Sequence, residues 1–446
     1  MKKYQESLET EKISKLLLRQ SVPAMIGLVV MSLYNVVDTI FIGHGAGTLA
    51  IAGLTIAFPI QMIIMAMAQT IGIGASSLIS IALGAKDFQK AEKALGNFFS
   101  LTLIVSLIVM ALGFVFLVPI LKAFGATSSL LPFAKDYLQI ILLGTFFISL
   151  ALGGNFVIRA EGNAKYAMGI MISSAVVNII LDPIFIFGFD MGLKGAAIAT
   201  VIAQFVAAFA AFMYFVTGRS GVYIHLKYFK LHLKTVKDIF SIGISSFARQ
   251  ASASVMAAIM NHSLGLYGGE IAIAAFGIIN RMLMIVLMPI FGIIQGMQPI
   301  LGFNYGAKKF LRARESIMLS IKAATLISSV AFILLMIFPK QISMIFSSDD
   351  ELISMSSSAV RLIILMLPVV GFQIVGGGIY QSIGKAMPAF ILSVLRQILF
   401  LIPLVLILPI FFGLEGIWMS FPLSDLLAFI VTFFMITKEL KYLQKS

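Results

Sequence analysis

The feature that most constrains this sequence is a succession of apolar runs, each long enough to cross a lipid bilayer as a helix. A helix rises about 1.5 Å per residue, so about 20 apolar residues cross about 30 Å of hydrocarbon. About twelve such runs follow one another. They lie near residues 15–42, 49–78, 94–118, 132–158, 166–188, 194–216, 238–263, 271–301, 315–338, 357–382, 388–411 and 415–437. The pattern predicts an all-α, polytopic membrane protein.

The composition supports this class and excludes several functions. The chain is 60% hydrophobic and 11% charged, against about 25% charged residues in soluble domains. It contains no Cys, which excludes disulfides, thiolate nucleophiles and Cys-based zinc sites, and its four His residues form no metal-binding pattern. The net charge of +13 does not indicate a nucleic-acid partner, because the basic residues lie between the apolar runs.

The positions of the basic residues predict the topology. Lys and Arg crowd both termini and every second connection, whereas the other side has only Lys122, Lys135, Lys194 and Lys340. Positively charged connections stay in the cytoplasm. We therefore expect both termini to be cytoplasmic. Residues 1–20 are charged and no small-residue cleavage site ends the next apolar run, so the first helix is expected to be the insertion signal.

An internal repeat divides the twelve runs six and six. A shift of 222 residues places Gly74 on Gly296, and it places residues 84–86 on residues 306–308, which are Gly-Ala-Lys in both copies. An even number of spans gives both halves the same orientation, as in transporters with two parallel halves. We predict an N-terminal lobe (1–216), a cytoplasmic connecting loop (217–237) and a C-terminal lobe (238–446).

The segment Val176–Gly188 (VVNIILDPIFIFG) places a carboxylate and a proline inside a hydrocarbon stretch. Asn178 and Asp182 are four residues apart, so a helix presents them on one face. Pro183 cannot donate to the carbonyl oxygen of Ile179. An acid at membrane depth is costly unless it faces a cavity or a partner, so the segment predicts a site for a proton or a metal cation.

Two further side chains, Asp38 and Thr200, bear on this site. Asp38 and Thr200 lie about as deep as Asp182 from the outer ends of their own runs, and Asn178 lies about one helical turn deeper. Four oxygen-bearing side chains then share one lobe, which suits a hard cation or a shared proton. The alternative is a hydrogen-bond network that only stabilises the lobe.

The sequence does not assign a function to the ionisable residues of the second half. Arg249 and Arg281 can line the cavity or bind backbone carbonyls, and Asp425 can pair with Arg396.

Four stretches resemble the multidrug and toxic compound extrusion (MATE) family, most closely its bacterial MepA-type branch. They are YNVVDTIFIGHGAG (Tyr34–Gly47), IRAEGNAKY (Ile158–Tyr166), NIILDPIFIFG (Asn178–Gly188) and QPILGFNYGAKK (Gln298–Lys309). The resemblance covers essentially the whole chain.

The resemblance implies a V-shaped protein of two six-helix lobes in a bacterial inner or plasma membrane. Such a protein exports lipophilic, mostly cationic compounds by antiport with H⁺ or Na⁺ through alternating access. The family's cation site matches Asp38, Asn178, Asp182 and Thr200 here, which are then also the expected ligands of a coupling Na⁺. A further Asn of that network matches Asn155. No cofactor is implied, the partners are the exported compounds and membrane lipids, and a monomer suffices.

The sequence also bears on two other functions. A lipid-linked-sugar flippase of the wider superfamily would line its cleft with basic groups, and Arg249, Arg281 and Arg396 keep that alternative open. An intramembrane enzyme needs a nucleophile or a metal motif such as HExxH, which this sequence does not contain. The particular substrates and the choice between H⁺ and Na⁺ stay open.

Overall fold

A computed structural model of the protein describes residues 2–445, and every regular element among them is a helix. The first half of the chain comprises α1 (Lys2–Thr10), α2 (Ile13–Gly84), α3 (Phe88–Val115), α4 (Leu117–Ala123), α5 (Leu131–Leu143), α6 (Thr145–Ala160), α7 (Ala164–Pro183), the π-helical η1 (Ile184–Gly188) and α8 (Gly192–Val216). The short 3₁₀ helix η2 (Leu226–Phe229) follows. The second half comprises α9 (Leu233–Gly306), α10 (Phe310–Ile337), α11 (Pro339–Met344), α12 (Asp350–Ile363), α13 (Leu367–Ser382), α14 (Ala386–Val394), the π-helical η3 (Leu395–Leu401) and α15 (Ile402–Lys445).

The membrane-spanning helices of the described chain agree with the twelve predicted runs. Eight helices are long and apolar enough to cross a membrane, with α2 counted as two, Ile13–Gly45 and Leu49–Gly84, on either side of Gly47. Two bent pairs, α5 with α6 and α12 with α13, raise this number to ten. Two of the ten, Leu233–Gly306 and Ala386–Gln444, are 74 and 59 residues long. Each contains one Gly with non-helical angles, Gly269 and Gly413, which divides it into two spans and brings the number to twelve.

The bent pairs differ from the single straight spans that the sequence predicts. The axes of α5 and α6 meet at 56° at Gly144, and those of α12 and α13 meet at 62° just before Pro368. Pro has no N–H to donate to the preceding turn, which explains the second break. At the first break a Cβ on Gly144 would lie 2.6 Å from a methyl of Val201 on α8, so only Gly fits there.

The predicted repeat is visible in the backbone. Left-handed conformations, which L side chains rarely adopt, recur 222 residues apart. They occur at Gly47 and Gly269, Lys86 and Lys308, and Gly162 and Gly384. Each pair ends or joins equivalent helices, so the two halves share their connections as well as their spans.

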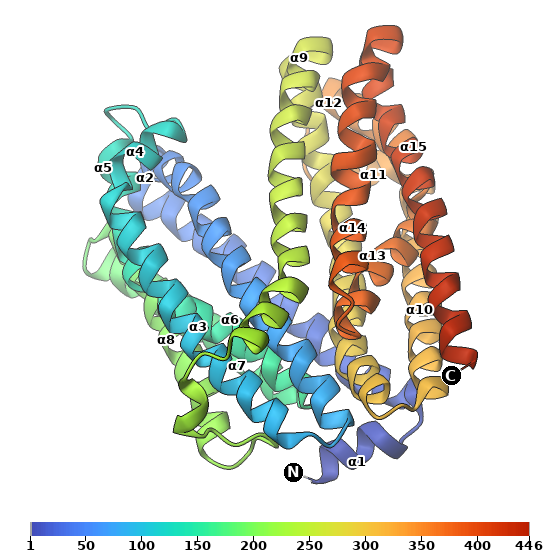
Figure 1. Cartoon of the computed structure of the whole chain (residues 1–446). Coiled ribbons are helices and arrows are strands. Elements are labelled where there is room, and N and C mark those ends of the chain that lie inside the picture. Colours follow the sequence, from blue (N-terminus) through green and yellow to red (C-terminus); the bar gives the residue numbers. More distant parts are fainter. Residues whose placement is uncertain (1, 446) are drawn as a thin grey trace. The chain divides into compact units, whose positions relative to one another are not determined.

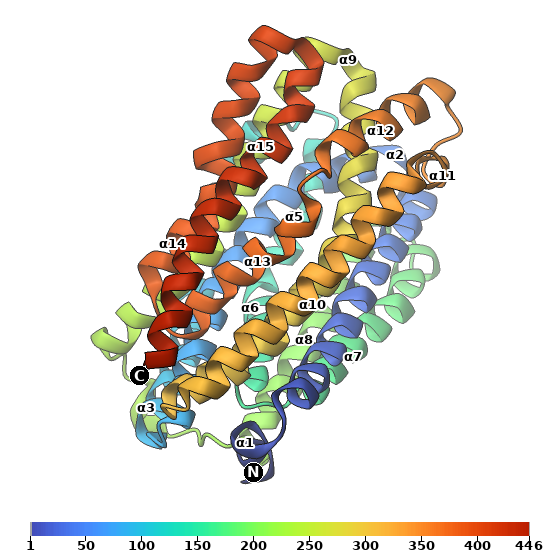
Figure 2. The same ribbon diagram turned by 90° about the vertical axis from the view of Figure 1, so that its right-hand side faces the viewer.

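The chain forms two compact units. Unit 1 contains Met1–Glu11 and Val22–Gly243, and unit 2 contains Lys12–Ser21 and Ile244–Ser446. The first turns of α9 therefore belong to unit 1, and the first turns of α2 belong to unit 2. Figure 1 shows α3, α5, α6, α7 and α8 packed together in unit 1, and Figure 2 shows α10, α13, α14 and α15 in unit 2.

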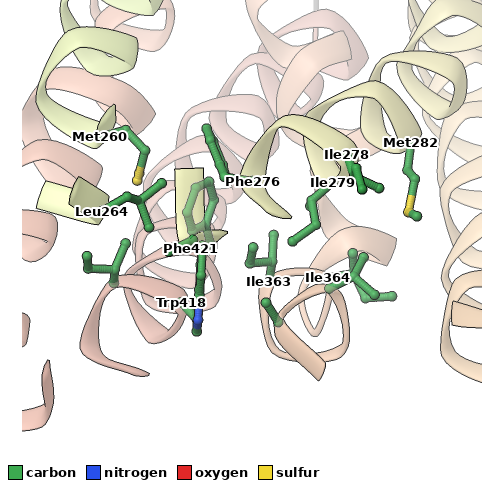
Figure 3. Close-up of a cluster of buried hydrophobic side chains, with 14 of the residues drawn as sticks. Met260, Leu264, Phe276, Ile278, Ile279, Met282, Ile363, Ile364, Trp418 and Phe421 are labelled. Atoms are coloured by element: carbon green, nitrogen blue, oxygen red, sulfur yellow. The ribbon is translucent and has the colours of Figure 1, made fainter. Parts of the chain in front are cut away.

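Each unit has its own apolar core, and the two cores correspond through the repeat. In unit 2, Leu264, Ala272 and Ile363 are buried in a cluster that also contains Trp418 and Phe421 (Figure 3). The residues 222 positions earlier, Ile42, Ala50 and Ile141, are buried in the core of unit 1. Equivalent positions of the two sequence halves thus fold to equivalent cores.

The outer surfaces of these helices are apolar as well. On α3 alone, Leu103, Leu107 and Leu112 are 46–53% exposed. A soluble protein rarely exposes so large an apolar patch, whereas lipid-facing helices do. The burial pattern therefore agrees with a multi-pass membrane protein.

Candidate functional site

The site is built on two helices of unit 1. Its Asn and Asp come from the last turns of α7. The N-cap of this helix is Asn163, whose side chain accepts a hydrogen bond from the Tyr166 N–H. Asn178 and Asp182 are both fully buried, and Asn178 Nδ2 donates to Asp182 Oδ1 at 3.1 Å. The four-residue spacing predicted this shared face, and the hydrogen bond confirms it.

Asp38 reaches the same place from the first half of α2, before Gly47. Its carboxyl group lies within hydrogen-bonding reach of the Asp182 carboxyl group, and the side chain is partly buried. The two acids are 144 positions apart in the sequence. Two carboxyl groups this close repel each other when both are ionised, so one shared proton or one bound cation relieves the repulsion.

Three oxygen atoms of this cluster lack a hydrogen-bond donor among the described residues. Asp38 Oδ1, Asn178 Oδ1 and Asp182 Oδ2 are all buried without a hydrogen-bond partner. Buried acceptors are almost always satisfied, because burying one without a donor costs about 1–3 kcal/mol. A set of unsatisfied acceptors from three side chains is the chemistry that receives a proton or a small cation.

Two tyrosines that the sequence did not identify lie near the acids. Tyr34 and Tyr137 both lie within electrostatic range of Asp38 and Asp182, and the Tyr137 side chain hydrogen-bonds to Gln61. Tyr34 precedes Asp38 by one helical turn, which is a local signal that could have been used. Tyr137 on α5 and Gln61 on α2 are brought in only by packing.

The other two predicted residues lie differently. Thr200 is buried on α8, yet among the described residues it makes no hydrogen bond to either acid. Asn155 on α6 is also buried, but its Nδ2 donates to Ala167 O at 2.8 Å and its Oδ1 accepts from Arg159 Nε at 2.8 Å. Ala167 and Asn178 are separated by three turns of α7, so Asn155 belongs to a separate network that contains Arg159.

The polar residues of unit 2 are largely engaged with one another. Arg396 forms an ion pair with Asp425, as the sequence allowed, and Gln373 Nε2 donates to the Asp425 backbone oxygen at 2.5 Å. Gln381 Nε2 donates to Ser245 Oγ and Ser246 Oγ at 2.9 and 3.1 Å. Arg281 is exposed and Arg249 is partly buried.

Among residues 2–445, no group of three His, Asp or Glu side chains is arranged to hold a metal ion. The cluster around Asp182 has two carboxylates only. It is therefore suited to a monovalent charge rather than to a resident divalent metal.

Comparison with known proteins extends this picture. The MatE family model matches residues 23–184 and 246–407, one segment in each half of the chain. The multidrug export protein MepA of Staphylococcus aureus (strain MSSA476) is 28% identical over 417 residues, which cover 94% of this chain and 92% of that protein. MepA of Staphylococcus haemolyticus (strain JCSC1435) is also 28% identical, over 95% of this chain and 94% of its own length.

Solved structures match as well. The structure of the MATE multidrug transporter DinF-BH, solved in complex with a ligand, is 47% identical, covers 96% of both chains and superimposes with a TM-score of 0.89. A crystal structure of MATE in the bent conformation is 28% identical, covers 99% of this chain and 98% of its own, and gives a TM-score of 0.94.

Proposed function

This chain belongs to the MatE family, and on that premise we propose that it exports lipophilic, mostly cationic drugs and toxic compounds by antiport with H⁺ or Na⁺. The relatives named multidrug export protein and the ligand-bound structure of a multidrug transporter support this proposal. The protein acts as a transporter and not as an enzyme. Alternating access of an N-terminal lobe (1–216) and a C-terminal lobe (238–446), joined by residues 217–237, carries the substrate across.

The observation that carries the proposal is the cluster of Asp38, Asn178 and Asp182. It holds two carboxyl groups within hydrogen-bonding reach and three buried oxygens without donors. One incoming proton bridges the two carboxyl groups and supplies one donor between them, after which the cluster carries one negative charge less. The coupling step is then the loading of this cluster from outside and its discharge to the cytoplasm. Thr200 completes the oxygen set if the ion is Na⁺.

The hydrogen-bonding reach of the two carboxyl groups favours the proton as the coupling ion. A shared proton needs no further ligand, whereas a hard metal cation takes about six or more oxygens. Among the described residues, the cluster offers three unsatisfied ones. Asn155, which the family pattern adds to the cation network, acts through Arg159 in this proposal.

The proposed setting is a bacterial inner or plasma membrane, with both termini and residues 217–237 in the cytoplasm. The supporting observation is the asymmetric distribution of Lys and Arg between the two sides. One chain contains the complete cluster, so a monomer surrounded by lipid is sufficient for transport.

A flippase of lipid-linked sugars is the second candidate. It would use basic groups to bind pyrophosphate, and the exposed Arg281 and the partly buried Arg249 are candidates for that role. Arg396 is not, because its charge is compensated by Asp425. Competition between a lipid pyrophosphate and a cationic dye during transport would favour this second function.

The decisive experiment uses purified protein in proteoliposomes. Efflux and binding of a lipophilic cationic dye are measured under separately imposed pH and Na⁺ gradients, in wild type, Asp38→Asn and Asp182→Asn. We expect both variants to bind dye and to lose gradient-driven efflux. Asp190→Asn is the matched control, because Asp190 is exposed and lies beyond the end of η1. Wild-type efflux in both site variants would show that the cluster only stabilises the lobe.

A further inference from the structure

The segment that connects α8 to α9 is fastened to α3 by a fully buried side chain. Asn97 Nδ2 donates to the backbone oxygen of Tyr228 at 3.2 Å, and Asn97 Oδ1 accepts from the His232 N–H at 2.9 Å. Ser100 Oγ donates to the Phe229 oxygen at 2.7 Å. Figure 1 shows the segment in green to yellow-green below α8. These bonds hold residues 228–232 in one backbone conformation.

Aromatic contacts hold the inner side of the same segment. The Phe229 ring stacks on Phe99 with centroids 6.1 Å apart. The Tyr228 ring is buried, and the ammonium groups of Lys227 and Lys93 lie 4.7 and 5.9 Å from its centroid. The segment is therefore an ordered surface and not a loose linker.

Two leucines on this ordered segment point away from the protein. Leu226 and Leu233 are each 86% exposed, which is the highest value for any large hydrophobic side chain whose burial is described. They are flanked by the exposed lysines Lys227, Lys230 and Lys234. We call these five side chains the Leu226–Lys234 platform. A rigid backbone cannot fold these leucines inward, so an apolar medium has to cover them from outside.

The charge around the platform limits what covers it. Residues 217–237 contain five Lys or Arg residues and no Asp or Glu. Of their two His side chains, His225 is exposed and His232 is partly buried. On neighbouring α3, Glu92 pairs with His225 at 3.4 Å and does not neutralise the lysines. A partner must then offer hydrocarbon and negative charge side by side. Anionic phospholipids do so, because their phosphates lie directly above their acyl chains.

We propose that the Leu226–Lys234 platform binds anionic phospholipids of the leaflet that it faces. Leu226 and Leu233 enter the boundary between headgroups and acyl chains, while Lys227, Lys230 and Lys234 pair with headgroup phosphates. The topology predicted from Lys and Arg makes this leaflet the cytoplasmic one, where anionic lipids gather. The lipid thereby fixes the start of α9, which packs in unit 1. This binding does not depend on the proposed transport activity.

The absence of Cys from the chain allows a direct test. Leu226→Cys is labelled with an environment-sensitive fluorophore, and the full-length protein is reconstituted in phosphatidylcholine vesicles with or without phosphatidylglycerol of the same acyl chains. Bromine atoms, which quench fluorescence, are placed on the chains of one lipid at a time. We expect brominated phosphatidylglycerol to quench the label at least threefold more than brominated phosphatidylcholine at equal mole fraction.

Two sets of substitutions separate specific binding from general charge. Lys227→Ala, Lys230→Ala and Lys234→Ala together should abolish the preference for phosphatidylglycerol. The matched control, Lys122→Ala with Lys135→Ala, removes exposed lysines predicted to lie on the opposite side and should preserve it. Equal quenching by both lipids in the otherwise unchanged protein, or a preference that survives the triple substitution, would overturn the proposal.

The unlabelled protein provides a second measurement. Native mass spectrometry in detergent should show phosphatidylglycerol retained at least tenfold over phosphatidylcholine by the wild type, and no such ratio in Leu226→Ser with Leu233→Ser. Glycerol phosphate, which has the headgroup but no acyl chain, should not compete. Competition by glycerol phosphate would identify a plain phosphate site. Dimers linked through a cross-linker at residue 226 would show that a second copy of the chain covers Leu226 and Leu233. Either result contradicts lipid binding.

Discussion

Arg396 and Asp425 form an ion pair inside unit 2, in which Arg396 Nε and Nη2 both donate to the carboxylate of Asp425. The corresponding positions in unit 1 are Ser174, which lies 222 residues before Arg396, and Gln204, because the offset of the repeat falls to 221 from Gly192 and Gly413 onward. Ser174 Oγ donates to Ala203 O at 3.1 Å. Unit 1 thus has neutral residues at the positions where unit 2 has this ion pair. Asp425 is 2% exposed, so its charge depends on Arg396.

Replacing only one member of this pair should be more harmful than replacing both. Arg396→Ser leaves a buried carboxylate without a partner and should lower the free energy of unfolding by about 3 kcal/mol. Arg396→Ser with Asp425→Ala removes both charges together and should restore most of that loss. Apparent melting temperatures of the three proteins in one detergent measure the effect. A double variant as unstable as Arg396→Ser would show that Arg396 does more for stability than compensate the buried charge of Asp425.

A second prediction concerns Glu161, in the turn between α6 and α7. Its carboxyl group is 4% exposed and accepts hydrogen bonds from Tyr214 Oη at 3.0 Å, Ser220 Oγ at 2.6 Å and Gly221 N at 2.8 Å. Burial raises the pKa of Glu161 from 4.5 to about 7, although the three hydrogen bonds act in the opposite direction.

A raised pKa means that the folded protein holds this proton more tightly than the unfolded chain does. The stabilising contribution of the proton is therefore complete below about pH 4.5 and is lost as the pH rises to about 7. The loss amounts to about 3 kcal/mol. Glu161→Gln keeps the shape and should flatten this part of the stability curve, measured as apparent melting temperature from pH 5 to 8. Parallel curves for both proteins would assign the pH dependence to other groups.

A third prediction tests the close approach of α2 and the first turns of α9 in unit 1. A Cβ on Gly243 would collide with the backbone oxygen of Thr70, and one on Gly74 would collide with that of Ile239. Backbone cannot move aside as a side chain can, so Gly243→Ala should destabilise the protein by about 2 kcal/mol or more. Gly169→Ala is the control, because open space surrounds Gly169 within α7 and Ala is the better helix former there. In thermal unfolding, the apparent melting temperature of Gly243→Ala should be clearly lower than that of Gly169→Ala.

A fourth prediction concerns the amide beside the acids. Asn178→Ala removes the donor to Asp182 Oδ1, a hydrogen bond to a charged group worth about 1.5–3 kcal/mol. We expect the initial rate of gradient-driven dye efflux to fall about tenfold, corresponding to about 1.4 kcal/mol. Ser173→Ala on the same helix removes only a hydrogen bond to the Ile170 oxygen and should keep the wild-type rate. An unchanged rate in Asn178→Ala would remove Asn178 from the coupling step.

The sequence by itself determined the helical class, the twelve spans and the repeat. These features follow from how many apolar residues stand in a row and from residues that recur at a constant interval, so no packing information is needed. The pairing of Asn178 with Asp182 was also predictable, because a spacing of four residues sets the direction of both side chains on one helix.

Only the tertiary structure decided what meets across helices. Depth along a span predicted that Asp38 and Thr200 lie level with Asp182, but depth does not give the rotation of a helix about its axis. Packing turned Asp38 toward Asp182 and brought Tyr137 beside both, whereas it directed Asn155 toward Arg159. It also placed Lys12–Ser21 in unit 2, although the rest of the first span lies in unit 1. Such contacts depend on the shapes of several helices at once, and no local pattern in the chain records them.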